Sequence, residues 1–399
     1  MSLTAEDIRN CTMIAMDQPP WWPVEVEEPF KFTINVTSLN TSYTIKRIIP
    51  NDFIGEIDWG DGTIDESPQP FQAYHRYARR GRYQIAITYQ NSGHSFPYST
   101  ECFFSPSQSV LSIDTKFQKI FKYFTTASRL FYNCSSLLTL PFGLFSHCTE
   151  ITDFSYCFAV CEYLQEIPSD LFHNCKKAIN FDYCFFNCTY NLQEIPSGLF
   201  DTCTEVVSFK GCFYYLYFIQ SIPSGLFDSC TKVTDFSDCF AYCQSLQSIP
   251  YGLFDACSEV TNFSTCFYYC RSLLAIPYGL FDSCTQVTDF SGCFYFCNSL
   301  VSIPDWLFDS CAEVTNFSNC FHYCSSLLTI PSGLLNYCRE VTNLTDCFNG
   351  CKKATSVPSL WITHSGATHE NCFTDCKQAS NYDSIPNDWK GLPVEEEGD

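Results

Sequence analysis

Cysteine is the residue type with the most chemical potential in this sequence, because 28 of the 399 residues are cysteines. The stretch SIPYGLFDACSEVTNFSTCFYYC, residues 248–270, holds three of them. Thiolates bind zinc where Cys-x₂₋₄-Cys pairs converge, and thiols at the right separation form disulfides. The pair Cys239 and Cys243, with its copies, has a spacing that zinc accepts. The cysteine side chains could therefore bind metal, form disulfides or be buried as free thiols.

A tandem repeat positions the cysteines. Prolines recur every 27 or 28 residues from Pro141 to Pro386, and 24 cysteines fall into three fixed phases of this frame. A period in this range indicates a solenoid, in which equivalent residues of adjacent coils lie about 5 Å apart. Stacked side chains point the same way, Leu216 replaces one cysteine, and a metal would be needed in every coil. We expect buried free thiols, with disulfides and metal ions as the alternatives.

Each repeat contains two similar halves. The pattern Phe-x-x-Cys followed by two apolar residues at the same spacing begins at Phe254 and again at Phe267. Phe and Cys three residues apart suit one helical or 3₁₀ turn, and the apolar pair suits a short strand on the core side. The predicted fold class is mainly β with short helical turns.

Four segments follow from the patterning. Residues 1–28 form a Pro/Trp-containing arm, in which Trp21 and Trp22 are candidate attachment residues. Residues 29–105 contain alternating stretches such as FKFTINV, which predict a small β-sandwich. Residues 106–380 form a solenoid of about ten coils, and residues 381–399 are an acidic tail.

The repeat array resembles the BspA-like, cysteine-bearing leucine-rich repeats of bacterial and protist surface proteins, in the local form CxSLxxIPxGLFDxCxxVTxFxxCF. This resemblance implies a binding surface without catalysis. The sandwich segment resembles the immunoglobulin-like PKD domain, which implies an extracellular spacer or adhesion module. We expect structural roles for Asp61 and His75 of this second motif, with a ligand-binding role as the alternative. The matching residues are Trp59, Gly60, Asp61, Gly62, His75, Tyr77, Gly81 and Tyr83.

An acidic column accompanies the repeats. Asp201, Asp228, Asp255, Asp282 and Asp309 occupy one repeat position. Asp side chains accept local backbone N–H bonds, so we expect these residues to cap the following turn. Calcium bridging between coils is the alternative.

Aromatic residues supply the candidate working surface. Two adjacent residues of one turn cannot both face a thin core, so at least one column is expected to reach solvent. Tyrosine suits contact with protein or sugar, because it offers a large area and a hydroxyl group. Packing between coils is the competing interpretation. The candidate binding residues are Tyr215, Tyr242, Tyr269, Phe296 and Tyr323, with Tyr214, Tyr268 and Tyr295 beside them.

Several function classes are excluded by composition. A net charge of -21 argues against nucleic-acid partners and anionic membranes, and no stretch has the roughly 18 apolar residues of a membrane span. The seven histidines are scattered, and no Gly-rich phosphate loop occurs. We therefore expect no enzymatic activity, no cofactor and no metal.

The function prediction combines two extracellular-type modules with the absence of a conventional signal peptide at the start of this sequence. We expect a bacteriophage virion component, exposed on the particle surface. Its arm and PKD-like domain would contact other virion proteins, and its repeats would bind a host-surface protein or glycan. The alternative is a cell-surface adhesin of a gut bacterium or protist. Assembly into a homo-oligomer stays open.

Overall fold

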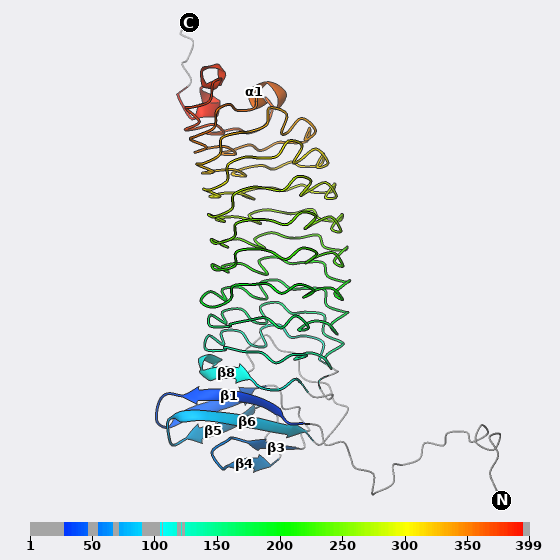
Figure 1. Cartoon of the computed structure of the whole chain (residues 1–399), viewed down its shortest axis with the longest axis vertical. Helices are drawn as coiled ribbons and strands as arrows, with labels where there is room; N and C mark the ends of the chain where they lie inside the picture. Colours follow the sequence, from blue (N-terminus) through cyan, green and yellow to red (C-terminus); the bar gives the residue numbers. More distant parts are fainter. Residues whose placement is uncertain are drawn as a thin grey trace, which may run out of the picture.

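The computed structural model describes residues 28–46, 55–66, 72–89, 104–105, 107–117, 121 and 124–393. These residues form a β part at one end and a tall stack of coils that extends from it (Figure 1). Within them the chain is mainly β with one short α-helix, as the fold class predicts. Trp21 and Trp22 lie outside the described residues, as do residues 394–399 of the tail.

The β part consists of two antiparallel sheets. One has the strand order β4-β3-β6-β1-β8, and the other has the order β5-β2-β7. The strands are β1 (Phe30–Val36), β2 (Thr41–Lys46), β3 (Gly55–Asp58), β4 (Ile64–Glu66), β5 (Gln72–Tyr77), β6 (Gly81–Tyr89), β7 (Phe104–Ser105) and β8 (Val110–Ile113).

Buried and partly exposed side chains alternate along the strands of the β part. Every second residue of β1 is buried, from Phe30 to Val36. The ring of Phe32 in the first sheet contacts Tyr43 and Phe104 of the second, with ring centroids 6.4 Å and 4.8 Å apart. The two sheets therefore share one apolar core, as a strand of period two predicts.

The tight turn after β3 is fixed by a polar and aromatic cluster. The His75 ring stacks on the Trp59 indole at 5.0 Å, and its Nε2 lies 2.8 Å from Asp61 Oδ2. Burial alone would raise the pKa of Asp61, but hydrogen bonds from Thr63 and His75 lower it. Asp61 and His75 thus bond to each other within the fold. The likeness to a PKD domain and the four segment boundaries stay predictions.

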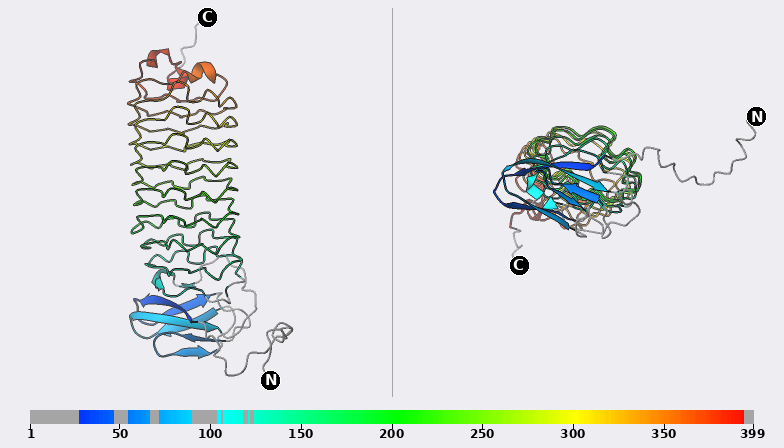
Figure 2. Two further views of the ribbon diagram at one scale, coloured as in Figure 1. Left: turned by 45° about the vertical axis from the view of Figure 1, so that its right-hand side comes forward. Right: turned by 90° about the horizontal axis from the view of Figure 1, so that it is seen from below.

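Residues 124–393, which we call the coil stack, repeat one loop of backbone. Two columns of parallel β-bridges join successive coils, for example from Asp235 to Asn262 to Asp289 and from Ser248 to Ala275 to Ser302. Backbone N–H groups donate to carbonyls 26 residues onward, as in Phe263 to Asp289 at 2.9 Å. Figure 2 shows the coils lying almost directly over one another along the stack. The 27-residue period is thus one turn of the stack.

Turns within each coil match the predicted Phe-x-x-Cys spacing. The N–H of Cys257 donates to the carbonyl of Phe254 at 2.9 Å, and the N–H of Cys266 donates to that of Phe263 at 3.1 Å. These i to i−3 bonds close single turns, and no α-helix longer than α1 (Leu360–Thr363) occurs in the described residues. The expectation of short helical turns therefore holds at the level of single turns.

Like side chains stack from coil to coil in the core. The rings of Phe236, Phe263 and Phe290 lie nearly parallel, with centroids 5.6 Å apart at each step. Phe240, Phe267 and Phe294 form a second such column, also at 5.6 Å. All of these rings are fully buried.

The 26 cysteines of the described residues are free thiols, and all are buried. The Sγ of Cys270 donates to the carbonyl of Phe240 in the preceding coil at 3.3 Å, and Cys297 repeats this contact to Phe267. Burial raises the pKa of Cys257 to about 12. Buried thiols are the fate that the sequence analysis favoured over disulfides and metal ions.

Both ends of the coil stack are covered. Strand β8 belongs to the first sheet and also bridges in parallel to the first coil, from Ser112 to Thr139. At the far end, the Trp389 ring stacks on His369 at 4.1 Å. The 3₁₀ turns η3 (Tyr382–Ser384) and η4 (Asp388–Lys390) lie here, and η1 (Ser107–Ser109) precedes β8. Terminal caps of this kind shield the core of a repeat array.

We expect the described thiols to be unreactive in the native protein. Burial shields all of them from reagents and raises the pKa of thiols such as Cys257, so a thiol reagent such as DTNB should label them only after unfolding. Intact mass measured without reductant should correspond to 28 free thiols. A deficit of two hydrogens for each bridge would contradict this expectation.

Neighbouring leucines offer a matched test of the core. Leu273 is fully buried, whereas Leu274 is 54% exposed. Leu273→Asp places an unpaired charge in the core and should destabilise the surrounding coils by several kcal/mol, while Leu274→Asp should change stability by less than about 0.5 kcal/mol. Limited proteolysis and thermal melts would report the difference. Equal effects of the two changes would show that the core assignment is wrong.

Candidate functional site

The eight aromatic residues predicted to form a stripe do come together. Tyr215, Tyr242 and Tyr269 lie on successive coils with ring centroids 4.4 Å and 4.8 Å apart, and Phe296 and Tyr323 continue the column at 5.2 Å and 4.8 Å. We call this column, with its neighbours Tyr214, Tyr268 and Tyr295, the aromatic ladder.

The main column of the ladder has a strained backbone. All five residues have positive φ, between 56° and 65°. This left-handed conformation costs most L-amino acids roughly 1–2 kcal/mol, whereas glycine and, less often, asparagine adopt it readily. Asn187 occupies the equivalent position on one side of the column and Gly350 on the other. On five successive coils, an aromatic residue therefore occupies a position whose backbone conformation favours glycine or asparagine.

Ring packing accounts for much of that cost. The Tyr268 ring lies tilted against Tyr295 at 5.1 Å, and Tyr295 stacks flat on His322 at 4.6 Å. His322 is buried, its Nδ1 lies 2.9 Å from Asn319 Oδ1, and burial lowers its pKa. Burial likewise raises the pKa of Tyr214. The rings of the ladder thus have one another as partners, and a role in binding stays a prediction for them.

The acidic column does not cap turns as expected. Within residues 124–393, no backbone N–H donates to the carboxylates of Asp201, Asp228, Asp255, Asp282 or Asp309. A different column has that role: the N–H of Ser264 donates to Asn262 Oδ1 at 2.8 Å, and the N–H of Ser291 donates to Asp289 Oδ1 at 2.7 Å. The prediction assigned capping to the wrong acidic position, because the direction of a side chain within a turn is not visible in the spacing.

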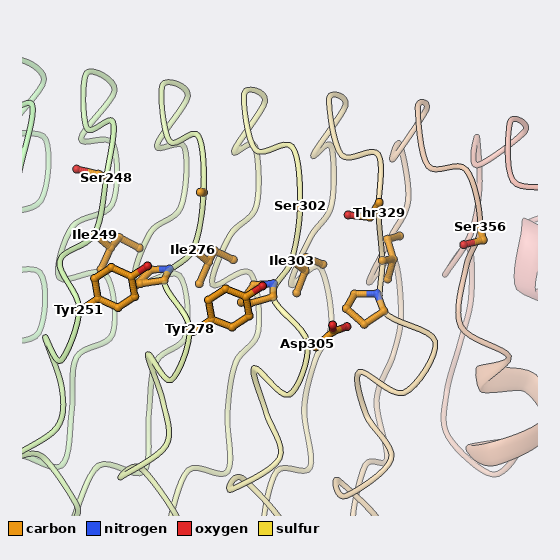
Figure 3. Close-up of a pocket in the computed structure, with 15 residues that line it drawn as sticks. Ser248, Ile249, Tyr251, Ile276, Tyr278, Ser302, Ile303, Asp305, Thr329 and Ser356 are labelled. Carbon is orange, nitrogen blue, oxygen red and sulfur yellow. The ribbon is translucent and has the colours of Figure 1, made fainter.

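A long groove follows the second column of β-bridges, and the sequence analysis did not anticipate it. Its volume is about 730 Å³. The Ile-Pro pairs of three coils form part of its wall, with hydroxyl side chains such as Ser248, Ser302 and Thr329 beside them. Figure 3 shows Tyr251 and Tyr278 on successive coils, with Asp305 on the next. We call this feature the proline-edge groove.

The aromatic side chains at this edge are more exposed than those of the ladder, which are half-buried except for Tyr323, which is 37% exposed. Tyr251 and Tyr278, which line the groove, are 73% and 63% exposed. Trp306, next to the groove residue Asp305, is 69% exposed. Three successive coils therefore present a large aromatic side chain to solvent, which is the pattern of a contact surface.

Trp306 also carries backbone strain. Its φ is 64°, and the equivalent residues Gly225, Gly252 and Gly279 have φ values of 73°, 71° and 69°. The turn that follows is the same in each coil, since the N–H of Asp309 donates to the Trp306 carbonyl at 3.1 Å as that of Asp255 does to the Gly252 carbonyl. Glycine would fit this position without strain. Strained residues held by a fold cluster at functional sites, so Trp306 marks this edge as a site candidate.

Signals for this groove do exist in the sequence. The residues after the repeat prolines read PSG, PYG, PYG, PDW and PSG from Pro223 to Pro331, while the core phases barely change. Variation confined to one position of a repeat indicates a surface that differs from coil to coil. The spacing alone could not show that Tyr251 points outward and Tyr242 lies against its neighbours.

Metal binding and membrane crossing find no support in the described chain. No group of three or more His, Cys, Asp or Glu side chains in the described residues is arranged to hold a metal ion. None of the helices found there has the length and apolar character that a bilayer span requires.

Comparison with known families gives one decisive match. Residues 179–306, 227–333 and 281–389 match the family described as "Mycoplasma protein of unknown function, DUF285", and together they cover more than half of the chain. The chain belongs to the DUF285 family. A search of curated proteins found no match for this DUF285 chain.

Two solved structures share low similarity with the DUF285 chain. A leucine rich cell surface protein from Faecalibacterium prausnitzii A2-165 is 16% identical over 70% of this chain and 93% of its own, with a TM-score of 0.17. TLR13, solved as the TLR13-ssRNA13 complex, is 12% identical over 56% of this chain and 45% of its own, with a TM-score of 0.14. TM-scores this low fix neither fold nor function.

The aromatic ladder of the DUF285 chain should contribute mainly to stability. Tyr269→Ala with Phe296→Ala removes five ring contacts, each worth about 0.5–1.5 kcal/mol. The change keeps the backbone strain, so we expect a loss of about 3 kcal/mol or more. Thermal or denaturant unfolding measures it.

The matched control is Tyr251→Ala with Tyr278→Ala, which removes two exposed rings and should leave the melting temperature nearly unchanged. A ladder variant that melts normally but fails to bind a partner would make the ladder the working surface, as the sequence analysis suggested.

Proposed function

We propose that this DUF285 protein is a non-enzymatic recognition protein of a cell surface or extracellular space, which binds its partner through the proline-edge groove. The observation that carries the proposal is the strained and exposed Trp306 beside a groove lined by Tyr251 and Tyr278. Large, rigid aromatic side chains provide contact area at a low cost in conformational entropy.

The construction of the coil stack supports binding over catalysis. Repeat stacks offer extended surfaces whose edge residues vary while the core stays constant. Nucleophilic cysteines require a lowered pKa and access to solvent, whereas the described thiols are buried and Cys257 has a raised pKa. These thiols are suited to packing and unsuited to nucleophilic attack.

The interpretation as a cell-surface protein is better supported than the interpretation as a bacteriophage virion component. The family is described from Mycoplasma, which are cellular bacteria. We therefore propose display at a cell surface, with the partner on a host or neighbouring cell.

Replacing Trp306 by glycine should separate stability from binding. Trp306→Gly relieves a strained φ, so we expect the free energy of unfolding to stay equal or rise by about 1 kcal/mol. The same change removes an exposed aromatic anchor, and we expect binding to weaken at least about fivefold, which corresponds to about 1 kcal/mol. The measurements are a thermal melt and titration of the full chain against hits from arrays of immobilised proteins and glycans.

Phe142→Ala is the control, because Phe142 also follows a repeat proline, is 70% exposed and lies outside the groove. It should leave binding unchanged. If Trp306→Gly destabilises the chain and leaves binding intact, Trp306 is a packing residue and the proposal is wrong.

A further inference from the structure

We infer that the proline-edge groove binds an extended polypeptide segment rich in lysine and arginine. This inference rests on the proposed function and adds the chemical class of the ligand. Three features of the groove support it: its length, the charge around it and the exposed aromatic faces in it.

The length suits an extended chain. The groove reaches from the coil of Ser248 to that of Ser356, which is four inter-coil steps. At about 5 Å for each step this distance is about 20 Å, which roughly six extended residues span at about 3.3 Å each. Its volume of about 730 Å³ is in the usual range for ligand sites.

Charge around the groove is acidic and is not neutralised locally. Asp305 lines it, and a second hollow of about 680 Å³, which shares Tyr251, is lined by Asp228 and Asp255. No lysine, arginine or histidine lines either hollow. Residues 211–338 hold ten acidic residues and two basic ones.

Both of those basic side chains have other partners. Lys232 Nζ lies 2.6 Å from Glu205 Oε2. The Arg271 guanidinium lies 4.1 Å from the centre of the Tyr269 ring, to whose hydroxyl it also hydrogen-bonds. Neither of these two side chains therefore competes with a cationic ligand for the carboxylates of the groove.

Exposed tyrosine faces complete the match. Cations are attracted to the face of an aromatic ring within about 6 Å of its centre. Tyr251 and Tyr278 offer such faces on the two coils that precede the coil of Asp305. Arg271 on Tyr269 shows the same contact elsewhere in this chain. A neutral glycan could use the rings and hydroxyls but would gain nothing from the carboxylates, and a nucleic acid would be repelled by them.

The test uses the purified full chain and a fluorescent twelve-residue oligolysine, with oligoglutamate and neutral chito-oligosaccharides as the other probes. We expect saturable binding of oligolysine that weakens as salt screens the charges, and no binding of oligoglutamate. Tyr251→Ala with Tyr278→Ala should weaken binding about tenfold. Asp305→Asn should weaken it about threefold and reduce its dependence on salt.

Two matched variants separate the groove from the general negative charge. Glu259→Gln removes one exposed charge that lines neither hollow, and Phe142→Ala removes an exposed ring from another coil. Both should bind oligolysine as the unchanged chain does. If they weaken binding as much as the groove variants do, attraction to oligolysine is non-specific and the inference is overturned.

The remaining outcomes distinguish the inference from the proposed function. If the groove variants lose binding of a chito-oligosaccharide and Asp305→Asn has no effect, the groove is the binding site and its ligand is a glycan, which overturns the inference alone. If array hits bind the groove variants and Trp306→Gly as well as the unchanged chain, the groove is not the binding site, and both proposals fail.

Discussion

Each buried phenylalanine ring of the coil stack lies against the same ring of the next coil, and this contact between identical side chains determines most of the remaining structure. Rings such as Phe236, Phe263 and Phe290 pack in parallel at 5.6 Å only if successive coils place their core residues on the same turns. The backbone bonds from coil to coil impose the same condition. One extra residue is tolerated outside these columns, because Phe181 and Phe209, which are 28 residues apart, still stack at 5.6 Å. The constraint therefore falls on the core positions, which admit little change.

The cysteines fit this constraint through their size. The spaces between the phenylalanine columns are closed by turns in which a cysteine N–H bonds back to a phenylalanine carbonyl. A thiol is small, apolar and able to donate weakly to a carbonyl of the previous coil, as Cys270 does. A larger side chain would push successive coils apart. The high cysteine content therefore reflects packing, and chemistry of the thiol group is suppressed by burial.

Much of this architecture follows from the sequence, because periodicity reports what the core requires. The turn at Phe254 and Cys257, the burial of the thiols and the alignment of Tyr242 with Tyr269 were all predictable from spacing. Side-chain direction was not: Asp255 and Asn262 both suit a turn, yet only Asn262 accepts a backbone N–H there. Pairing of β8 with β1 depends on contacts far apart in the chain, which no local pattern carries. The groove was missed for the same reason, since an exposed tyrosine and a stacked one have the same spacing.

The two aromatic surfaces share the same kind of backbone strain but differ in whether internal packing offsets it. In the ladder, the cost of positive φ at Tyr269 or Phe296 is offset by rings on both sides. Trp306 has the same kind of backbone strain, but its side chain is mostly in solvent. Because Trp306 is so exposed, its internal contacts offset little of the energetic cost of a positive φ. Glycine at the equivalent position of neighbouring coils avoids this cost. The contact with another molecule that we propose for this edge would account for a tryptophan at this position. Because such residues lie at the edge of a coil, one coil can change its exposed side chains while the phenylalanine columns that hold the stack together stay as they are.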